Sequence, residues 1–238
     1  MSEQIQAQLP EAEQALQPAR LVQTLALLGL LAAVLSLYLF AKLASEVREG
    51  DTISFDNVVR GWVHQFASPD MTLAMKGISL LGYDVLLLEL VIAVAVFLRL
   101  QWRRAAIWLT VTMAGAVALD VALKHAFHRQ RPAPFFGDAP HSYSFPSGHA
   151  LASFCFYGVL AGLIANRIQR LSLRIAVGLI AALLVLAIGI SRIYLGVHYP
   201  SDVVAGYLAA AMWVGTMLVI DHVGTSALAY ARSRKDRA

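Results

Sequence analysis

Six apolar segments of about 20 residues each dominate the sequence, and they constrain its fold more than any other feature. A hydrocarbon layer of about 30 Å is crossed by an α-helix of about 20 apolar residues. The chain is 58% hydrophobic and 14% charged, whereas a soluble domain is about a quarter charged. We therefore expect an all-α bundle of six transmembrane helices over residues 21–43, 75–98, 105–123, 149–165, 173–190 and 201–220.

A shorter stretch between the first two apolar segments has a different pattern. Within residues 44–70, Phe55, Val58 and Trp62 recur at helical spacing. Asp56 and Arg60 fall between them. This pattern predicts a short amphipathic helix that lies on the membrane after the first span, with Trp62 at the interface.

Both ends of the chain are polar. We expect a cytoplasmic N-terminal tail over residues 1–20, one membrane domain over 21–222 and a basic cytoplasmic tail over 223–238. The first apolar segment follows a long acidic lead, and no A-x-A site comes after it. We therefore expect it to be retained as a helix and not cleaved as a signal peptide. A single cysteine, Cys155, excludes an intrachain disulfide.

Basic residues predict the orientation in the membrane. If the N-terminus is cytoplasmic, 11 of the 19 lysines and arginines fall on the inner side, where such residues are enriched. We therefore expect both termini in the cytoplasm of a bacterial inner (plasma) membrane. This placement accounts for the net charge of +4 without a nucleic-acid partner. The inner residues are Arg20, Arg99, Arg103, Arg104, Arg167, Arg170, Arg174, Arg232, Arg234, Lys235 and Arg237.

Three polar clusters occur where apolar segments end or begin, over residues 124–132, 145–149 and 191–202. In the orientation above, all three lie on the outer, periplasmic side. Hydrolysis of a phosphate ester needs cations around the phosphoryl oxygens, a nucleophile and an acid for the leaving group. The clusters contain residue types suited to each of these roles.

The cationic part consists of two arginines and a lysine. Arg131 and Arg192 offer planar forks for phosphate oxygens, and Lys124 offers a point charge. Ser147 and Gly148 precede an expected helix, whose first backbone N–H groups can bind an anion.

Two histidines suit the remaining roles. His149 begins the same helix and is suited to donate a proton. His198 is suited to act as the nucleophile, with Asp202 accepting a hydrogen bond from its other ring nitrogen. Together the clusters predict a phosphate-ester site at the membrane surface.

The clusters read K-x6-RP, PSGH and SR-x5-H-x3-D within residues 124–202. In this order and spacing they resemble the signature of the type-2 phosphatidic acid phosphatase superfamily. This superfamily contains membrane lipid phosphatases and shares its site with bacterial acid phosphatases and vanadium haloperoxidases. The resemblance implies that His198 becomes a phosphohistidine, that His149 protonates the leaving alcohol and that no metal or cofactor is needed. It also implies that the phosphoryl group is held by Lys124, Arg131, Ser147, Gly148 and Arg192.

Three further charged residues need an explanation. Arg129 either contacts the second phosphate of a diphosphate substrate or faces lipid headgroups. Asp120 lies one helical turn before Lys124, and we expect the two to pair, because an isolated charge in the bilayer costs about 2.5–3.5 kcal/mol. Glu89 lies well inside the apolar segment 75–98, and the sequence gives no firm account of it.

We therefore predict an integral membrane lipid phosphatase that hydrolyses a phosphate mono- or diphosphate ester. Undecaprenyl diphosphate, phosphatidylglycerol phosphate, phosphatidic acid and lipid A phosphates all fit, and the sequence decides neither among them nor on the oligomeric state. A phosphotransferase with another acceptor is the nearer alternative. A transporter or pore is disfavoured because the charges gather at one edge of the bundle. A haloperoxidase is disfavoured because those relatives are not built of six spans.

Overall fold

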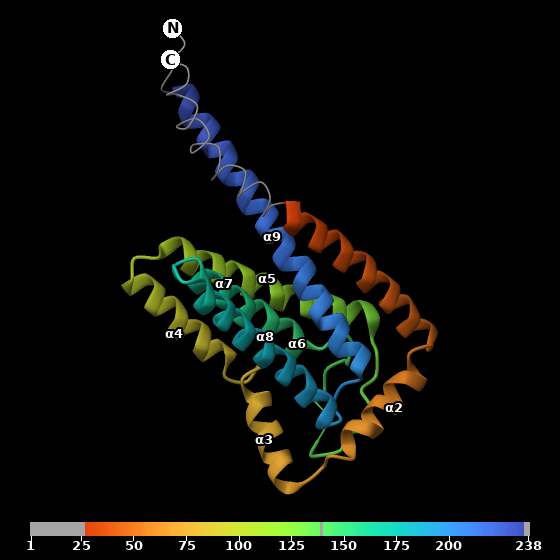
Figure 1. Ribbon diagram of the computed structural model, residues 1–238. Coiled ribbons are helices and arrows are strands. Elements are labelled where there is room, and N and C mark those ends of the chain that lie inside the picture. The colour runs from red at the N-terminus through yellow and green to blue at the C-terminus, as the bar shows by residue number, and fades with distance from the viewer. Residues whose placement is uncertain (1–26, 139, 236–238) are drawn as a thin grey trace.

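The computed structural model describes residues 27–138 and 140–235, and over these residues the protein is built of helices without strands (Figure 1). The expected N-terminal tail lies outside the described residues. Within them, five helices are long and apolar enough to cross a membrane. These are Leu27–Glu49, α5 (Arg103–Phe127), Gly148–Ala165, α8 (Leu171–Tyr194) and Pro200–Gly224, the last being the apolar part of α9 (Pro200–Lys235).

The expected single helix over residues 75–98 is wrong, because the chain forms two helices there. α3 (Pro69–Leu80) and α4 (Leu86–Arg99) are separated by turns over residues 81–85. α3 begins where a sequence can start a helix well: Ser68 accepts a hydrogen bond from the Met71 N–H, and proline occupies the first turn.

The interruption is explained by the close approach of other helices to Gly82. A Cβ at this position would lie 2.5 Å from Cγ2 of Ile188 and 2.9 Å from Cδ2 of His149. Glycine also lowers helix stability by about 1 kcal/mol relative to alanine. The break therefore brings the backbone directly against α8 and the start of the helix at residue 148.

Glu89 has a partner that helps to hold this break. The Tyr157 hydroxyl lies 2.7 Å from Oε2 of Glu89 and 3.0 Å from the carbonyl oxygen of Leu81. This hydroxyl therefore joins Glu89 on α4 to the turn that follows α3.

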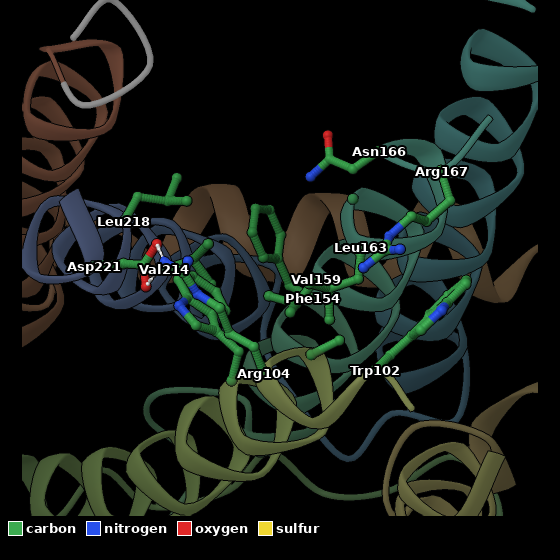
Figure 2. A pocket seen from close by; sticks show the side chains of 14 residues that line it. Trp102, Arg104, Phe154, Val159, Leu163, Asn166, Arg167, Val214, Leu218 and Asp221 are labelled. Carbon is green, nitrogen blue, oxygen red and sulfur yellow. Dashed lines mark hydrogen bonds and ion pairs between the residues drawn. The ribbon is translucent and has the colours of Figure 1, made fainter. Parts of the chain in front are cut away.

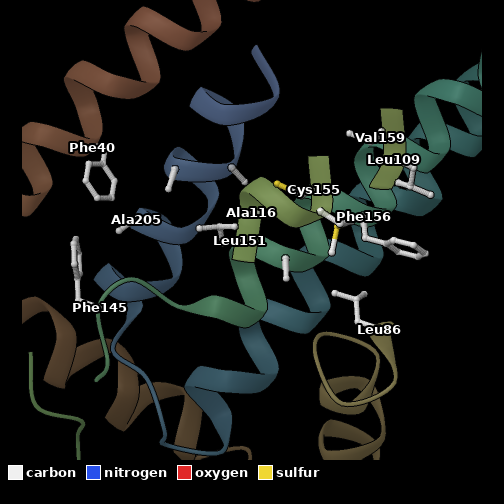
Figure 3. Packing of buried hydrophobic residues seen from close by; sticks show 14 of the residues in the cluster. Phe40, Leu86, Leu109, Ala116, Phe145, Leu151, Cys155, Phe156, Val159 and Ala205 are labelled. Carbon is white, nitrogen blue, oxygen red and sulfur yellow. The ribbon is translucent and has the colours of Figure 1, made fainter. Parts of the chain in front are cut away.

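The helix Gly148–Ala165 is the centre of the bundle. It consists of α6 (Gly148–Ser153), a π-helical turn η1 (Phe154–Gly158) and α7 (Val159–Ala165), and α6 packs against α5, α8 and α9. Figure 3 shows the buried apolar side chains at this centre, several of them alanine. Small residues allow helices in lipid to approach closely. Examples from this core are Leu109, Ala116, Leu151, Cys155 and Ala205.

α2 (Ile53–His64) occupies the region where a short amphipathic helix was expected, but its polar face points inward. Asp56 and Arg60 are buried, whereas Phe55, Val58 and Trp62 are exposed. In Figure 1, α2 and α3 lie around the end of the bundle where α8 ends and α9 begins. The polar residues of α2 therefore belong to the interior of that end.

Gly206 on α9 offers a test of this packing. A Cβ there would lie 2.6 Å from the backbone oxygen of Ser147, at the start of α6. Gly206→Ala should therefore cost about 1–3 kcal/mol, and lower the apparent Tm in detergent by several degrees. Gly162→Ala is the matched control, since nothing lies within 4 Å of its Cβ position. Equal melting temperatures for the two variants would contradict the packing described.

Candidate active site

The predicted cationic and histidine residues gather around one cavity of about 680 Å³ at an end of the bundle. There α5 and α8 end, and α6 and α9 begin. A second cavity, of about 550 Å³, lies towards the opposite ends of α5 and α7 (Figure 2). Its Arg104 is already paired with Asp221 at 2.6 Å, and the described residues that line it include no histidine, serine or cysteine. The first cavity is therefore the candidate active site.

His198 lines this cavity with only 1% of its surface exposed. Its Nε2 atom lies 2.9 Å from Nη1 of Arg131, and its Nδ1 atom lies 3.4 Å from Oδ2 of Asp202. A guanidinium can only donate, so Nε2 is the unprotonated nitrogen, and Nδ1 carries the hydrogen facing Asp202. Burial lowers the pKa of His198 to about 4, because Asp202 offsets only part of the desolvation and Arg131 adds to it.

Asp202 is fixed by donors on several sides. Its Oδ2 atom accepts hydrogen bonds from the Ser144 hydroxyl and, at 2.8 Å, from the Tyr199 N–H. Its Oδ1 atom accepts from Nη1 of Arg129 at 2.6 Å. With its lone pairs occupied in this way, the carboxylate holds one orientation towards His198.

Arg129 does not line the cavity, which corrects both sequence-based interpretations of this residue. Its side chain is 11% exposed and joins two fully buried carboxylates, Asp202 and Asp56, the latter at 2.8 Å. Asp56 also accepts hydrogen bonds from the Ser201 N–H and hydroxyl at 2.9 and 2.6 Å. Both terminal nitrogens of Arg129 are engaged in this network, so Arg129 holds in place the carboxylate of Asp202 that faces His198.

The remaining cations do face the cavity. Arg131 is fixed by the carbonyl oxygens of Ser142 and Val197, at 2.7 and 2.8 Å. Nη1 of Arg192 donates to the Ser79 hydroxyl on α3, and its Nε atom is buried without a partner in the described chain. Both guanidinium groups therefore have fixed positions before any substrate binds.

Lys124 pairs with Asp120 at 2.7 Å, which confirms the expected i,i+4 ion pair. Gly148 makes room for this pair, because a Cβ there would lie 3.0 Å from both Asp120 carboxylate oxygens and from Nζ of Lys124. Only glycine therefore allows the start of α6 to approach these charges without a shift.

Ser147 is placed differently from the sequence-based expectation. Its backbone N–H donates to the carbonyl oxygen of Asp202 at 2.9 Å, so this group is not free for an anion. Its hydroxyl is buried and has no hydrogen-bond partner among the described residues. Ser147 thus ties α6 to α9 through its backbone and leaves only the hydroxyl for other contacts.

His149 lines the cavity from the first turn of α6. Its ring stacks on Tyr83, with centroids 5.4 Å apart, and its Nε2 atom lies 4.0 Å from Oδ2 of Asp84. Sequence reasoning missed both neighbours, because it assumed one continuous helix through residues 81–85. It also missed Asp56. The amphipathic pattern of residues 53–64 predicts that polar residues face water, whereas Asp56 is buried.

Comparisons with known proteins agree with this geometry. The family model "PAP2 superfamily" matches residues 105–224, which include every residue of the three clusters. The chain belongs to the PAP2 superfamily. This membership confirms the resemblance drawn from the motifs.

Relatives in the PAP2 superfamily are membrane lipid phosphatases. Phosphatidylglycerophosphatase B of Bacillus subtilis is 31% identical over 72% of this chain and 86% of its own length. Undecaprenyl-diphosphatase of Sulfolobus acidocaldarius is 32% identical over 49% of this chain and 55% of its own. The crystal structure of the transmembrane PAP2-type phosphatidylglycerolphosphate phosphatase from Bacillus subtilis has a TM-score of 0.70 at 28% identity, covering 82% of this chain and 95% of that one. The protein is thus a multi-pass membrane hydrolase of phosphoric esters that acts on lipids.

Removing Arg129 should reveal how strongly the site depends on it. Arg129→Met leaves Asp56 and Asp202 buried without their shared cation, which typically costs about 3–5 kcal/mol. We expect a strongly lowered Tm in detergent, and partial recovery when Asp56→Asn is added. Arg104→Met, which breaks an exposed pair with Asp221, should cost less than about 1 kcal/mol. If Arg129→Met were as stable as that control, the bridge would be unimportant.

Proposed function

We propose that the protein hydrolyses a phosphate monoester on a membrane lipid, through a phosphohistidine formed at Nε2 of His198. The observation that carries this proposal is the position of Nε2. It is unprotonated, and it faces a cavity that Lys124, Arg131 and Arg192 also line. An aligned nucleophile surrounded by fixed cations suits attack on a phosphoryl group.

In the first step, the phosphoryl oxygens take the guanidinium of Arg131 away from Nε2 of His198. The Nε2 lone pair then attacks phosphorus, and the bond from phosphorus to the leaving oxygen breaks. His149 gives its proton to that oxygen, so that a neutral alcohol departs. Asp202 stabilises the positive charge that develops on the His198 ring, as its hydrogen bond with Nδ1 would allow.

In the second step, water attacks the phosphohistidine. His149, now neutral, accepts the proton of that water, and the bond between phosphorus and Nε2 breaks. Inorganic phosphate leaves, and both histidines return to their starting states. The residues that hold the phosphoryl group in both steps are Lys124, Arg131, Gly148 and Arg192, joined by the Ser147 hydroxyl. No metal takes part in either step.

A monophosphate is favoured over a diphosphate because of Arg129. This residue was the sequence's candidate for a second phosphate, and both of its terminal nitrogens are engaged by buried carboxylates, those of Asp56 and Asp202. Phosphatidylglycerol phosphate, the substrate named for the Bacillus subtilis relative, fits this requirement. Phosphatidic acid and lipid A phosphates fit it as well, and undecaprenyl diphosphate is the main competitor.

We further propose six crossings, with α3 and α4 together forming the second, and α2 lying on the outer surface. The apolar side chains of α2 that are exposed, such as Phe55 and Trp62, support contact with lipid. Arg103, Arg104 and Arg167 lie at the end of the bundle opposite the cavity. By the positive-inside rule this end is cytoplasmic, so the cavity opens at the outer leaflet of the inner membrane and both termini are cytoplasmic.

The decisive experiment measures phosphate release from a panel of lipids by protein purified in detergent. His198→Asn should lower kcat by about 10³-fold or more, because the nucleophile is lost. His128→Asn is the matched control, since it removes an imidazole that lies outside the cavity and keeps a left-handed position that asparagine tolerates.

The same assay distinguishes the alternatives. It contains EDTA, so activity that disappears and returns with a divalent cation would contradict a metal-free mechanism. Phosphate transferred to a second lipid or a sugar, seen by mass spectrometry, would make the protein a phosphotransferase. Substantial activity of purified His198→Asn would exclude the phosphohistidine.

The pH dependence gives a separate prediction. The nucleophile works when neutral, and burial lowers the pKa of His198 to about 4. The neutral form is therefore retained down to about pH 4 and is lost below it. The acid limb of kcat/KM should lie near pH 4, once the data are corrected for the second ionisation of the phosphate near pH 6. A corrected limb near 6.5, the value of an ordinary histidine, would contradict this burial effect.

A further inference from the structure

His149 has an unusual environment for a proposed proton donor. Its Nε2 atom is buried and makes no hydrogen bond to any described residue. Buried polar atoms without a partner are rare in proteins and usually have a functional explanation. The charges around this atom determine whether it can hold a proton.

Most of the charge around His149 is positive. The charged and titratable groups that face it are Tyr83, Asp84, Lys124, Arg131, Arg192 and His198. Asp120 neutralises Lys124 at 2.7 Å, but the two arginines still oppose a positive charge on the ring. A protonated His149 in this position needs a negative charge near Nε2.

Asp84 provides that charge. Its Oδ2 atom lies 4.0 Å from Nε2 of His149, and both residues line the cavity. The Asp84 side chain is 59% exposed, so its carboxylate stays hydrated at the mouth of the site while the histidine is enclosed. No other carboxylate lies within 4.0 Å of a His149 ring nitrogen among the described residues.

The residues just before Asp84 hold its backbone in place. The neighbouring Tyr83 stacks on His149, and Gly82 brings the chain against the same ring. The carbonyl oxygen of Leu81 contacts the Tyr157 hydroxyl on the π-helical turn. The break between α3 and α4 thus holds an acidic side chain over one particular histidine.

The geometry points to Asp84 as a positioning residue for the general acid: its carboxylate lies beside Nε2 and stabilises the protonated form of His149. This inference rests on the proposed function, since it requires His149 to be the acid. It assigns a role to a residue outside the three motifs. Asp84 acts through His149 and exchanges no atoms with the substrate.

The test compares pH profiles of kcat/KM for four proteins, with a lipid monophosphate as the probe. The alkaline limb reports the loss of the proton from His149. In Asp84→Asn this limb should move down by about 0.7 pH unit, the shift in pKa that one charge 4 Å away produces in water. The acid limb, which reports His198, should not move. Asp84→Glu should keep the wild-type profile. Asp70→Asn removes the same charge from the first turn of α3, outside the cavity, and should also leave the profile unchanged.

A second readout separates an effect on the proton from a general loss of structure. An alkyl phosphate needs a proton on its leaving oxygen, whereas the p-nitrophenolate of p-nitrophenyl phosphate leaves without one. Asp84→Asn should therefore lower kcat at least several-fold more for the alkyl substrate than for p-nitrophenyl phosphate. A variant equally slow on both substrates, with both limbs unmoved, would show a merely structural role and overturn the inference.

The outcomes for the two proposals differ. If the wild type hydrolyses lipid phosphates and Asp84→Asn keeps both the alkaline limb and the substrate ratio, the inference about Asp84 fails while the proposed function stands. If the wild type hydrolyses none of the lipids, the proposed function itself fails.

Discussion

The site depends on one buried bridge, in which the guanidinium of Arg129 joins the carboxylates of Asp56 and Asp202. Buried charges are tolerated only when they are paired and hydrogen-bonded. Every member of this network meets that condition through Ser144, Ser201 or a backbone N–H. Through this bridge a short helix near the N-terminus fixes the carboxylate behind the nucleophile.

The bridge also explains why α2 buries polar side chains and exposes apolar ones. A surface helix in water usually buries apolar residues and exposes polar ones. In the proposed placement of α2 on the outer membrane surface, its exposed apolar side chains contact lipid, and its polar side chains are buried against the rest of the protein. Asp56 accepts a hydrogen bond from the N–H of Ser201 in the first turn of α9. Arg60 donates to the carbonyl oxygens of Ala133 and Gly196. The helix thus joins α9 to the two loops beside the site.

Much of this arrangement could be predicted from the sequence, because the decisive signals were local. Apolar length predicted the long helices, and i,i+4 spacing predicted the pair of Asp120 and Lys124. The direction of Arg129 could not be predicted, because its partner Asp56 lies 73 residues away and carries no signal of burial. The break after Leu80 was missed for a related reason: the segment is apolar throughout, and only the contacts of Gly82 with distant helices show why a continuous helix would not fit.

That break shows how the scaffold and the chemistry are linked. A continuous helix over residues 75–98 would satisfy its own backbone, and interrupting it leaves backbone polar groups that need other partners. Tyr157 contacts one of these, the Leu81 carbonyl, and Glu89 shares the same hydroxyl. Local rules are commonly broken where function requires it. Here the interruption places Tyr83 and Asp84 beside His149, so a costly irregularity in one helix supplies the surroundings of a histidine on another.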